Sequence, residues 1–124
     1  MKTITARCSC GAVHLQATGQ PDRVGLCHRT GCKRAHGAMF CAAAIFPAAA
    51  VSIHGNTRDQ RGRHFCLICS APVFARSGEE VEIHLGALDD ADAFVTSYEC
   101  WVKRRAPLLA PIEDAAQFDR DRQI

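Results

Sequence analysis

The sequence of 124 residues lacks the apolar run of about 18–20 residues that a membrane-spanning helix requires. Its longest apolar stretch, residues 39–51, consists mainly of alanine and is interrupted by Pro47. Residues 1–7 lack the apolar core of a secretory signal peptide. Low-complexity segments and internal repeats are missing as well. We therefore expect a cytoplasmic protein that has no membrane partner.

Aromatic residues and lysine are also scarce. Aromatic side chains make up 6% of the chain, which leaves no platform for stacking nucleic-acid bases. The formal net charge is +2, so the sequence lacks the broad positive field that attracts a phosphate backbone. Both features argue against nucleic acid as a partner. Arginine outnumbers lysine by 12 to 3, however, and its planar guanidinium suits a small anionic partner.

Cysteine, in contrast, is abundant, with eight residues in the chain. In a secreted protein this number would suggest a framework of disulfides. In the reducing cytosol, clustered cysteines more often bind metal ions or take part in chemistry. The expected location therefore favours metal binding or catalysis over disulfides.

Short segments alternate apolar and polar residues between glycines and prolines, as half-buried strands do. Strands are expected at residues 3–7, 13–17, 40–46, 51–54, 64–65, 72–76 and 81–85. The intervals are too short for repeated strand–helix–strand crossovers, so we expect an all-β fold with mainly antiparallel sheets. Helical turns are expected at residues 30–36 and 89–94, the second capped by Asp89. Residues 1–124 should form a single domain, with an irregular C-terminal arm from about residue 105.

Two short cysteine motifs predict a metal site. Cys8 and Cys10 form a C-x-C-G knuckle, and Cys66 and Cys69 form a C-x-x-C knuckle. Two such chelating turns from separate hairpins can complete the tetrahedral shell of one Zn²⁺. The alternative is that these are buried or redox-active cysteines, since free cysteine is often buried. Two chelating pairs in one small domain favour zinc, and a closed four-sulfur site would be structural.

Further motifs extend along nearly the whole chain. They are Cys8-Ser9-Cys10-Gly11-Ala12-Val13, Cys27-His28-Arg29-Thr30-Gly31-Cys32-Lys33-Arg34, His36-Gly37-Ala38, Ala44-Ile45-Phe46-Pro47, Val51-Ser52-Ile53-His54-Gly55, His64-Phe65-Cys66-Leu67-Ile68-Cys69-Ser70-Ala71-Pro72, His84-Leu85-Gly86-Ala87-Leu88-Asp89-Asp90 and Trp101. Together they resemble the glutathione-dependent formaldehyde-activating enzyme family, which shares its domain with centromere protein V.

The resemblance implies a β-tent fold built around one structural tetracysteine zinc, and a second, catalytic zinc held by a C-H-C-x-x-C motif. It also implies a carbon–sulfur lyase, which joins formaldehyde to the thiol of glutathione to give S-hydroxymethylglutathione. Cys27 and Cys32 match the first and last cysteines of that motif, as catalytic residues and ligands of the second zinc. The middle position is Arg29, which offers no lone pair to a metal. One tightly bound Zn²⁺ and a weak or empty second site are therefore expected.

Two functions are compatible with Arg29 at the middle position of the motif. In the first, Arg29 or a metal ion lowers the pKa of a thiol, and a thiolate attacks a small carbonyl. The thiolate could belong to Cys27, to Cys32 or to a bound thiol substrate such as glutathione. In the second, the chain is a non-catalytic, zinc-stabilised binding module that has lost the chemistry. An enzyme should keep a cleft beside Cys27 and Cys32 with anion-binding arginines, whereas a module should present a flat or basic face.

Several neighbouring residues carry secondary expectations. Lys33 and Arg34 are expected to hold substrate carboxylates. Cys41 and His64 are candidates to complete a second metal site if the fold brings them close. His36 is expected at the surface or at a hinge. Cys100, beside the single tryptophan, is expected to be a packing residue.

Overall fold

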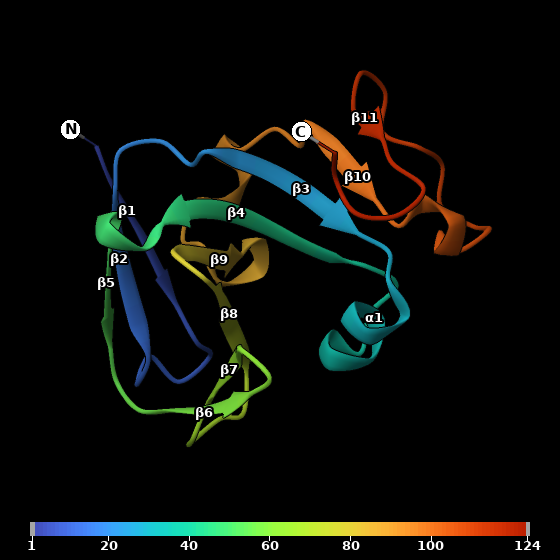
Figure 1. Cartoon of the computed structure of the whole chain (residues 1–124). Coiled ribbons are helices and arrows are strands. Elements are labelled where there is room, and N and C mark those ends of the chain that lie inside the picture. The colour runs from blue at the N-terminus through green and yellow to red at the C-terminus, as the bar shows by residue number, and fades with distance from the viewer. Residues whose placement is uncertain (1, 124) are drawn as a thin grey trace.

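The computed structural model describes residues 2–123 and consists mainly of β-strands (Figure 1). The strands are β1 (Thr3–Arg7), β2 (His14–Thr18), β3 (Arg23–Cys27), β4 (Cys41–Pro47), β5 (Val51–His54), β6 (Thr57–Gln60), β7 (Arg63–Cys66), β8 (Pro72–Ser77), β9 (Glu80–His84), β10 (Tyr98–Cys100) and β11 (Ala116–Gln117). The helices are α1 (Thr30–His36) and the 3₁₀ turns η1 (Ala48–Ala50), η2 (Leu85–Ala87), η3 (Ala91–Ala93) and η4 (Val102–Arg104). The predicted all-β class is confirmed.

The strands of residues 2–123 form two sheets. β1, β2 and β5 make a three-stranded sheet, and the others make an eight-stranded sheet in the order β11-β10-β3-β4-β9-β8-β7-β6. Within these residues the pairs are antiparallel, except that β10 runs parallel to both β3 and β11. A parallel neighbour requires a crossover of about a dozen residues or more. Residues 85–97, which contain η2 and η3, carry the chain from β9 across the sheet to β10, and residues 101–115 connect β10 to its parallel neighbour β11.

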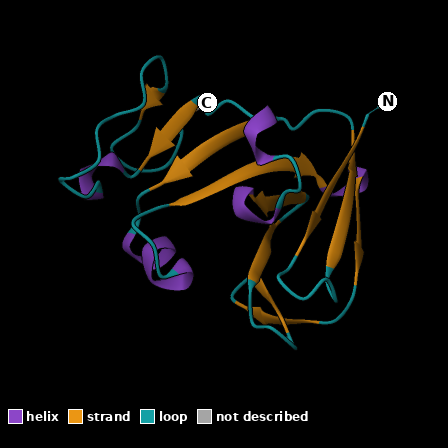
Figure 2. Cartoon of the chain, turned by 180° about the vertical axis from the view of Figure 1, so that it is seen from behind, coloured by secondary structure: helices purple, strands orange, loops and turns teal. Residues whose placement is uncertain are grey.

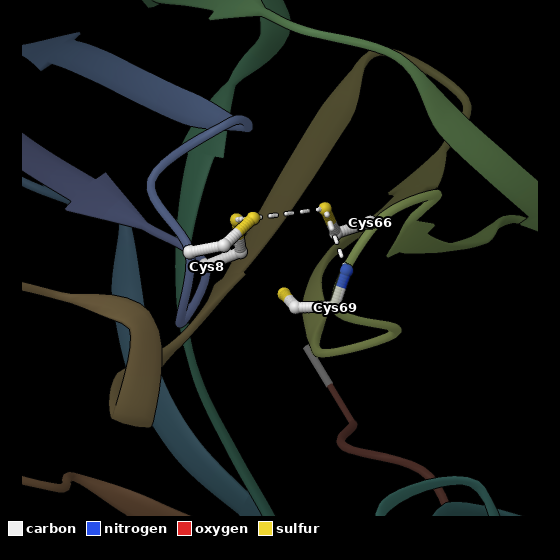
Figure 3. A group of neighbouring side chains, drawn as sticks. Cys8, Cys66 and Cys69 are labelled. Atoms are coloured by element: carbon white, nitrogen blue, oxygen red, sulfur yellow. Dashed lines mark hydrogen bonds between the residues drawn. The ribbon is translucent and has the colours of Figure 1, made fainter.

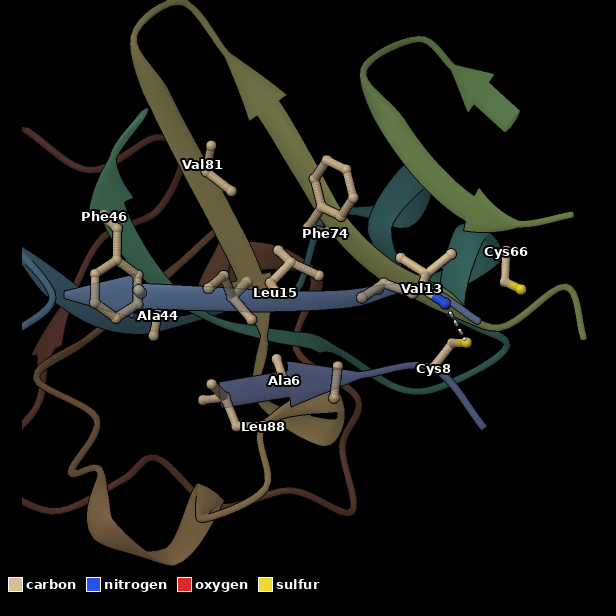
Figure 4. Packing of buried hydrophobic residues seen from close by; sticks show 14 of the residues in the cluster. Ala6, Cys8, Val13, Leu15, Ala44, Phe46, Cys66, Phe74, Val81 and Leu88 are labelled. Atoms are coloured by element: carbon tan, nitrogen blue, oxygen red, sulfur yellow. Dashed lines mark hydrogen bonds between the residues drawn. The ribbon is translucent and has the colours of Figure 1, made fainter. Parts of the chain in front are cut away.

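The hydrophobic core lies where the small sheet packs against one face of the large sheet (Figure 4). β2 shows the alternation that positions it: Leu15 and Ala17 are buried, whereas the residues between and beside them are exposed. Phe74 and Val81 of the large sheet face the same cluster. Cys8 and Cys66 lie at the end of this cluster, so both predicted cysteine knuckles border the core.

Helix α1 matches the helical turn predicted from the sequence, and it connects β3 to β4. It lies on the side of the molecule away from the three-stranded sheet, in both views (Figure 2). The second helical prediction is only partly matched, because residues 91–93 form a single 3₁₀ turn. Asp89 does not cap that turn but accepts a hydrogen bond from Thr5 Oγ1 at 2.6 Å. Across residues 2–123, the helices are too short or too polar to span a bilayer.

The segment after residue 105 folds back along β10. The amide of Trp101 donates to the carbonyl of Arg120 at 2.8 Å, and the amide of Phe118 donates to the carbonyl of Glu99 at 2.9 Å. Trp101 Nε1 also donates to Asp121 Oδ1 at 2.8 Å. The C-terminal segment is therefore held beside the end of β3, near Cys27. That residues 1–124 form one domain stays a prediction.

Replacing Gly55 with alanine should lower the free energy of unfolding by more than about 3 kcal/mol. Gly55 follows β5 with φ at +99°, and an added methyl group would overlap the carbonyl oxygen of Ala12 and lie 2.9 Å from Val13 Cα. Both neighbours are backbone atoms and cannot rotate away. Urea unfolding of the purified variant measures the loss.

Gly78→Ala is the matched control for this substitution. Gly78 also has a positive φ, at +59°, but an added methyl group would meet no atom of the described chain within 4 Å. Gly78→Ala should therefore lower the free energy of unfolding by only about 1 kcal/mol, the cost of a non-glycine residue in the left-handed region. Equal losses in the two variants would show that the contact with Ala12 is unimportant.

Candidate metal centre and active-site cavity

The two predicted cysteine knuckles converge in space. Cys8 and Cys10 lie in the turn between β1 and β2, and Cys66 and Cys69 in the turn between β7 and β8 (Figure 3). The residue after each knuckle has a positive φ, +80° at Gly11 and +65° at Ser70, which turns the backbone around the cysteines. The four sulfur atoms all lie within 4.8 Å of one another, so the group could hold a metal ion.

Distances within this group fit a tetrahedral metal better than disulfides. The sulfur of Cys10 is 3.7 Å from those of Cys8 and Cys66. Four sulfurs at 2.3 Å from one zinc ion would be separated by about 3.8 Å, whereas a disulfide requires about 2.0 Å. All eight cysteines of the described chain are free thiols.

Backbone amides also point at the sulfurs. The amide of Val13 donates to Cys8 Sγ at 3.3 Å, and that of Ile68 donates to Cys66 Sγ at 3.3 Å. The pKa of Cys69 is lowered to about 6, chiefly by a hydrogen bond from the backbone at Ala71. These amides favour the thiolate form, which is the form that binds a metal.

Three further cysteines form a row across the large sheet at its other face. Cys27 of β3 is paired in register with Cys41 of β4 on one side and with Cys100 of β10 on the other. Cys32, in helix α1, adds a fourth thiol, with its sulfur 3.3 Å from Cys27 Sγ. The sequence predicted that Cys100 is a packing residue, but the structure places it in a cluster of thiols.

The pKa of two thiols of this cluster is lowered: that of Cys100 by its hydrogen bond with Cys27, and that of Cys32 by several neighbours. Hydrogen bonds from Cys27 and then Cys41 lower the pKa of Cys32 well below its ordinary value, and contacts with Arg63 and Arg29 add to the effect. Arg63 Nη2 lies 3.7 Å from Cys32 Sγ. Hydrogen bonds with Cys100 and Cys32 raise the pKa of Cys27, and the hydrogen bond with Cys32 raises that of Cys41, so that Cys27 and Cys41 remain thiols.

The thiol cluster opens into a cavity of about 360 Å³. Arg29 and Arg63 line this cavity, and together with Cys27 and Cys32 they form the arginine-bordered cleft that the sequence predicted for an enzyme. Lys33 was expected to bind substrate carboxylates, but its amino group donates instead to the backbone carbonyl of Arg104. Arg29 and Arg63 are therefore the cations that line this cavity.

His28 and His64, which neighbour the cysteines in sequence, have ordinary structural partners. His28 is fully buried, and its Nε2 lies 2.7 Å from Glu99 Oε1. His64 Nδ1 lies 2.8 Å from Thr57 Oγ1, and its ring stacks on Phe74. The fold does not bring His64 into either metal-ligand group of residues 2–123, so it is not the missing ligand.

A three-thiolate zinc site at residues 27–32, which the resemblance implies, does not fit the side chains present. Two sulfurs remain, and the third position is occupied by Arg29, whose guanidinium contacts Cys32. A second cation, Arg63, also lies beside Cys32. Two fixed positive charges oppose a divalent ion at this position, and neither offers it a lone pair.

A different group of ligands lies next to this position. His36, Cys41 and His84 bring three ligand atoms within 4.8 Å of one another. His36 was expected at the surface or a hinge, but it is half-buried, with its ring 4.3 Å from that of His84. His84 was not recognised as a site residue. Two features of the sequence point to this group. Cys32 and His36 are four residues apart on a predicted helix, and His84 stands at the end of a predicted strand.

The chain is similar to known proteins in sequence and in fold. The sequence model described as glutathione-dependent formaldehyde-activating enzyme matches residues 3–104. Comparison with curated proteins finds no match. The crystal structure of a Rhodobacter sphaeroides protein, a structural genomics target, is similar with a TM-score of 0.53 and 19% sequence identity. The alignment covers 74% of this chain and 96% of that one, and at this identity it supports the fold alone.

Proposed function

The chain belongs to the glutathione-dependent formaldehyde-activating enzyme family, and from this premise we propose that it catalyses reversible addition of a thiol to a small carbonyl compound. The membership suggests a role related to glutathione and formaldehyde. The reaction proposed is that of a carbon–sulfur lyase, with glutathione as the thiol and formaldehyde as the carbonyl. The observation that carries the proposal is the thiolate-favouring position of Cys32 in a cavity lined by two arginines.

Cys8, Cys10, Cys66 and Cys69 are proposed to hold one structural Zn²⁺. The 3.7 Å sulfur separations and the amide donors support this assignment. A closed four-sulfur shell leaves no open coordination position, so this ion would stabilise the fold and take no part in the reaction.

Cys32 is proposed as the nucleophile and Cys27 as the proton donor. The sulfur of Cys32 attacks the carbonyl carbon and forms a carbon–sulfur bond, and the π electrons of the carbonyl move to its oxygen. Cys27, 3.3 Å away and retained as a thiol, gives that oxygen its proton. The product is a hydroxymethyl thioether on Cys32, with Cys27 left as a thiolate.

The second half of the reaction transfers the carbonyl unit. The Cys27 thiolate takes back the hydroxyl proton while the carbon–sulfur bond to Cys32 breaks, which releases formaldehyde and the Cys32 thiolate. The incoming thiol gives its proton to the Cys32 thiolate and attacks the carbonyl carbon, and Cys27 protonates the carbonyl oxygen. A proton transfer from Cys32 to Cys27 then restores the starting state of the two cysteines. Arg29 and Arg63 are placed to hold the carboxylates and the thiolate of an anionic thiol such as glutathione.

An exchange experiment by NMR with formaldehyde and glutathione tests this function. The wild-type protein should accelerate exchange above the spontaneous rate, and Cys32→Ser should return it to that rate. Arg63→Ala should lower kcat/KM by roughly 10–100-fold, because it removes a hydrogen bond to a charged group. Its pH profile should also shift upward, since Arg63 helps to lower the pKa of Cys32.

Arg58→Ala is the matched control, because Arg58 lies exposed on β6 away from this cavity. It should leave the exchange rate unchanged. If folded wild-type protein does not exceed the spontaneous rate, the proposed reaction is wrong. That result would favour the second candidate, a non-catalytic zinc-stabilised binding module, for which the replacement of the motif's middle cysteine by Arg29 is the supporting observation.

A further inference from the structure

His36, Cys41 and His84 form a group that takes no step in the reaction above, in which Cys41 serves only as a hydrogen-bond neighbour of Cys32. His36 is the last residue of α1, Cys41 the first of β4 and His84 the last of β9. These three element ends meet at one place, which borders both the 360 Å³ cavity and a second cavity of about 690 Å³. The position is thus accessible from two sides.

The registers of the sheet explain why the side chains converge. β4 and β9 are antiparallel neighbours, and His84 is paired with Ala43. Cys41 precedes Ala43 by two residues, so that Cys41 and His84 project from the same face of the sheet. Ala44, the next residue along β4, points into the core on the opposite face, where it is fully buried. Helix α1 then places His36 over Cys41 and His84.

A second, independent observation at His84 points to a bound ligand at this position. Its side chain is 6% exposed, and its Nδ1 is buried without a hydrogen-bond partner among residues 2–123. A buried polar atom of this kind costs roughly 1–3 kcal/mol unless a ligand satisfies it. A metal ion that accepts the lone pair of Nδ1 would remove that penalty.

From these contacts we propose that His36, Cys41 and His84 bind one divalent transition-metal ion, such as Zn²⁺, with a fourth position open to the cavity. Binding of the ion would displace the proton that Cys41 otherwise keeps. The resulting set of two imidazoles and one thiolate suits zinc, and three protein ligands leave a position for water or substrate. Ligand atoms around zinc lie about 3.3–3.6 Å apart in such a site. Small side-chain rotations close the present group, whose atoms are within 4.8 Å, to that spacing.

The surrounding charges are compatible with an ion here. Arg63 lines the same cavity, but it is paired with the favoured thiolate of Cys32 at 3.7 Å. Glu82, which lines the same cavity from β9, adds a carboxylate. Ion binding at this position is separable from the thiol chemistry at Cys32, because none of the three ligands is a reacting group there.

Native mass spectrometry of the full chain after incubation with Zn²⁺ and removal of free ions tests the site. Wild-type protein should carry two ions, one here and one on the four cysteines of the knuckles. His36→Gln and Cys41→Ser should each carry one ion and keep the wild-type circular dichroism spectrum. Their affinity for the second ion should fall by more than about 100-fold, since even an outer-shell change costs 10–100-fold.

Two further variants separate this site from its neighbours. Cys27→Ser should still bind two ions, because Cys27 is not a proposed ligand. Loss of the second ion in Cys27→Ser would place that ion on the motif of residues 27–32 and overturn the proposal. His64→Gln, a histidine outside the group, should also keep two ions. One ion in wild-type protein, or two in both His36→Gln and Cys41→Ser, would equally overturn it, whatever the rate of thiol exchange.

Discussion

Replacing Cys66 with serine is expected to leave no cooperatively folded protein. Cys66 is 2% exposed and belongs to both the hydrophobic core and the four-cysteine group. Binding of a structural zinc ion contributes about 10–16 kcal/mol at neutral pH. A domain of this size has a net stability of about 5–15 kcal/mol. Loss of one of four ligands therefore removes free energy comparable to the whole stability of the fold. Soluble yield, zinc content and far-ultraviolet circular dichroism measure the result.

Cys100→Ser makes the same atomic change outside the four-cysteine group and is the control. It should keep the zinc ion of the knuckles and a cooperative thermal transition. A strong chelator added to wild-type protein should reproduce the behaviour of Cys66→Ser. A cooperative melt of Cys66→Ser near the wild-type temperature would show that the fold does not depend on the metal.

The four-cysteine group could be predicted from the sequence because each half is local. A C-x-C-G and a C-x-x-C motif each preform one chelating turn, and strong strand signals on both sides position the turns. Gly11, which ends the C-x-C-G motif, permits the positive φ that the backbone has there. Bringing the two halves together then required only that both hairpins border one core. That the ion is zinc stays a prediction.

Strand β3 escaped prediction because its burial removes the signal used to find strands. Val24, Gly25 and Leu26 are all buried, since β3 lies between β4 and β10 inside the large sheet. A strand covered on both faces shows no alternation of apolar and polar residues. Without β3, the sequence gives no reason to place Cys27 beside Cys41 and Cys100.

The second ligand group depends on register, which a single sequence does not encode locally. His84 and Cys41 are far apart in the chain and share a face only because β9 pairs with β4 in one register. A shift of one residue would turn His84 to the opposite face of the sheet. The same holds for the row of cysteines, which needs β10 to cross over and run parallel to β3.

Glu99 joins the C-terminal segment to the end of β3. The ionisation of its carboxyl group should make the free energy of unfolding depend on pH in the acidic range. The carboxylate is 1% exposed. It lies 2.7 Å from His28 Nε2 and accepts hydrogen bonds at 2.8 Å from the amide of Ile112 and the side chain of Gln117. Burial alone would raise the pKa of Glu99, but these donors and Arg105 outweigh it and lower the pKa to about 2.

The direction of the pH effect follows from the two states. The pKa of Glu99 is about 2 in the folded protein, against an ordinary 4.5 in the unfolded chain. The ionised carboxylate therefore stabilises the fold above about pH 4.5, and this contribution is lost as the pH falls from about 4.5 to about 2. The shift corresponds to about 3 kcal/mol.

Glu99→Gln should remove this contribution and leave the donors around it poorly satisfied. At about pH 7 the variant should be less stable than wild-type protein by about 3–5 kcal/mol, the cost of breaking a buried pair. The difference should shrink towards about pH 3, because wild-type Glu99 begins to lose its advantage there while the cysteine group is the same in both proteins. Glu79→Gln, at an exposed turn, should follow wild-type protein at every pH. Urea unfolding across this range measures the difference, and a constant gap between Glu99→Gln and wild type would contradict the assigned role of the Glu99 carboxylate.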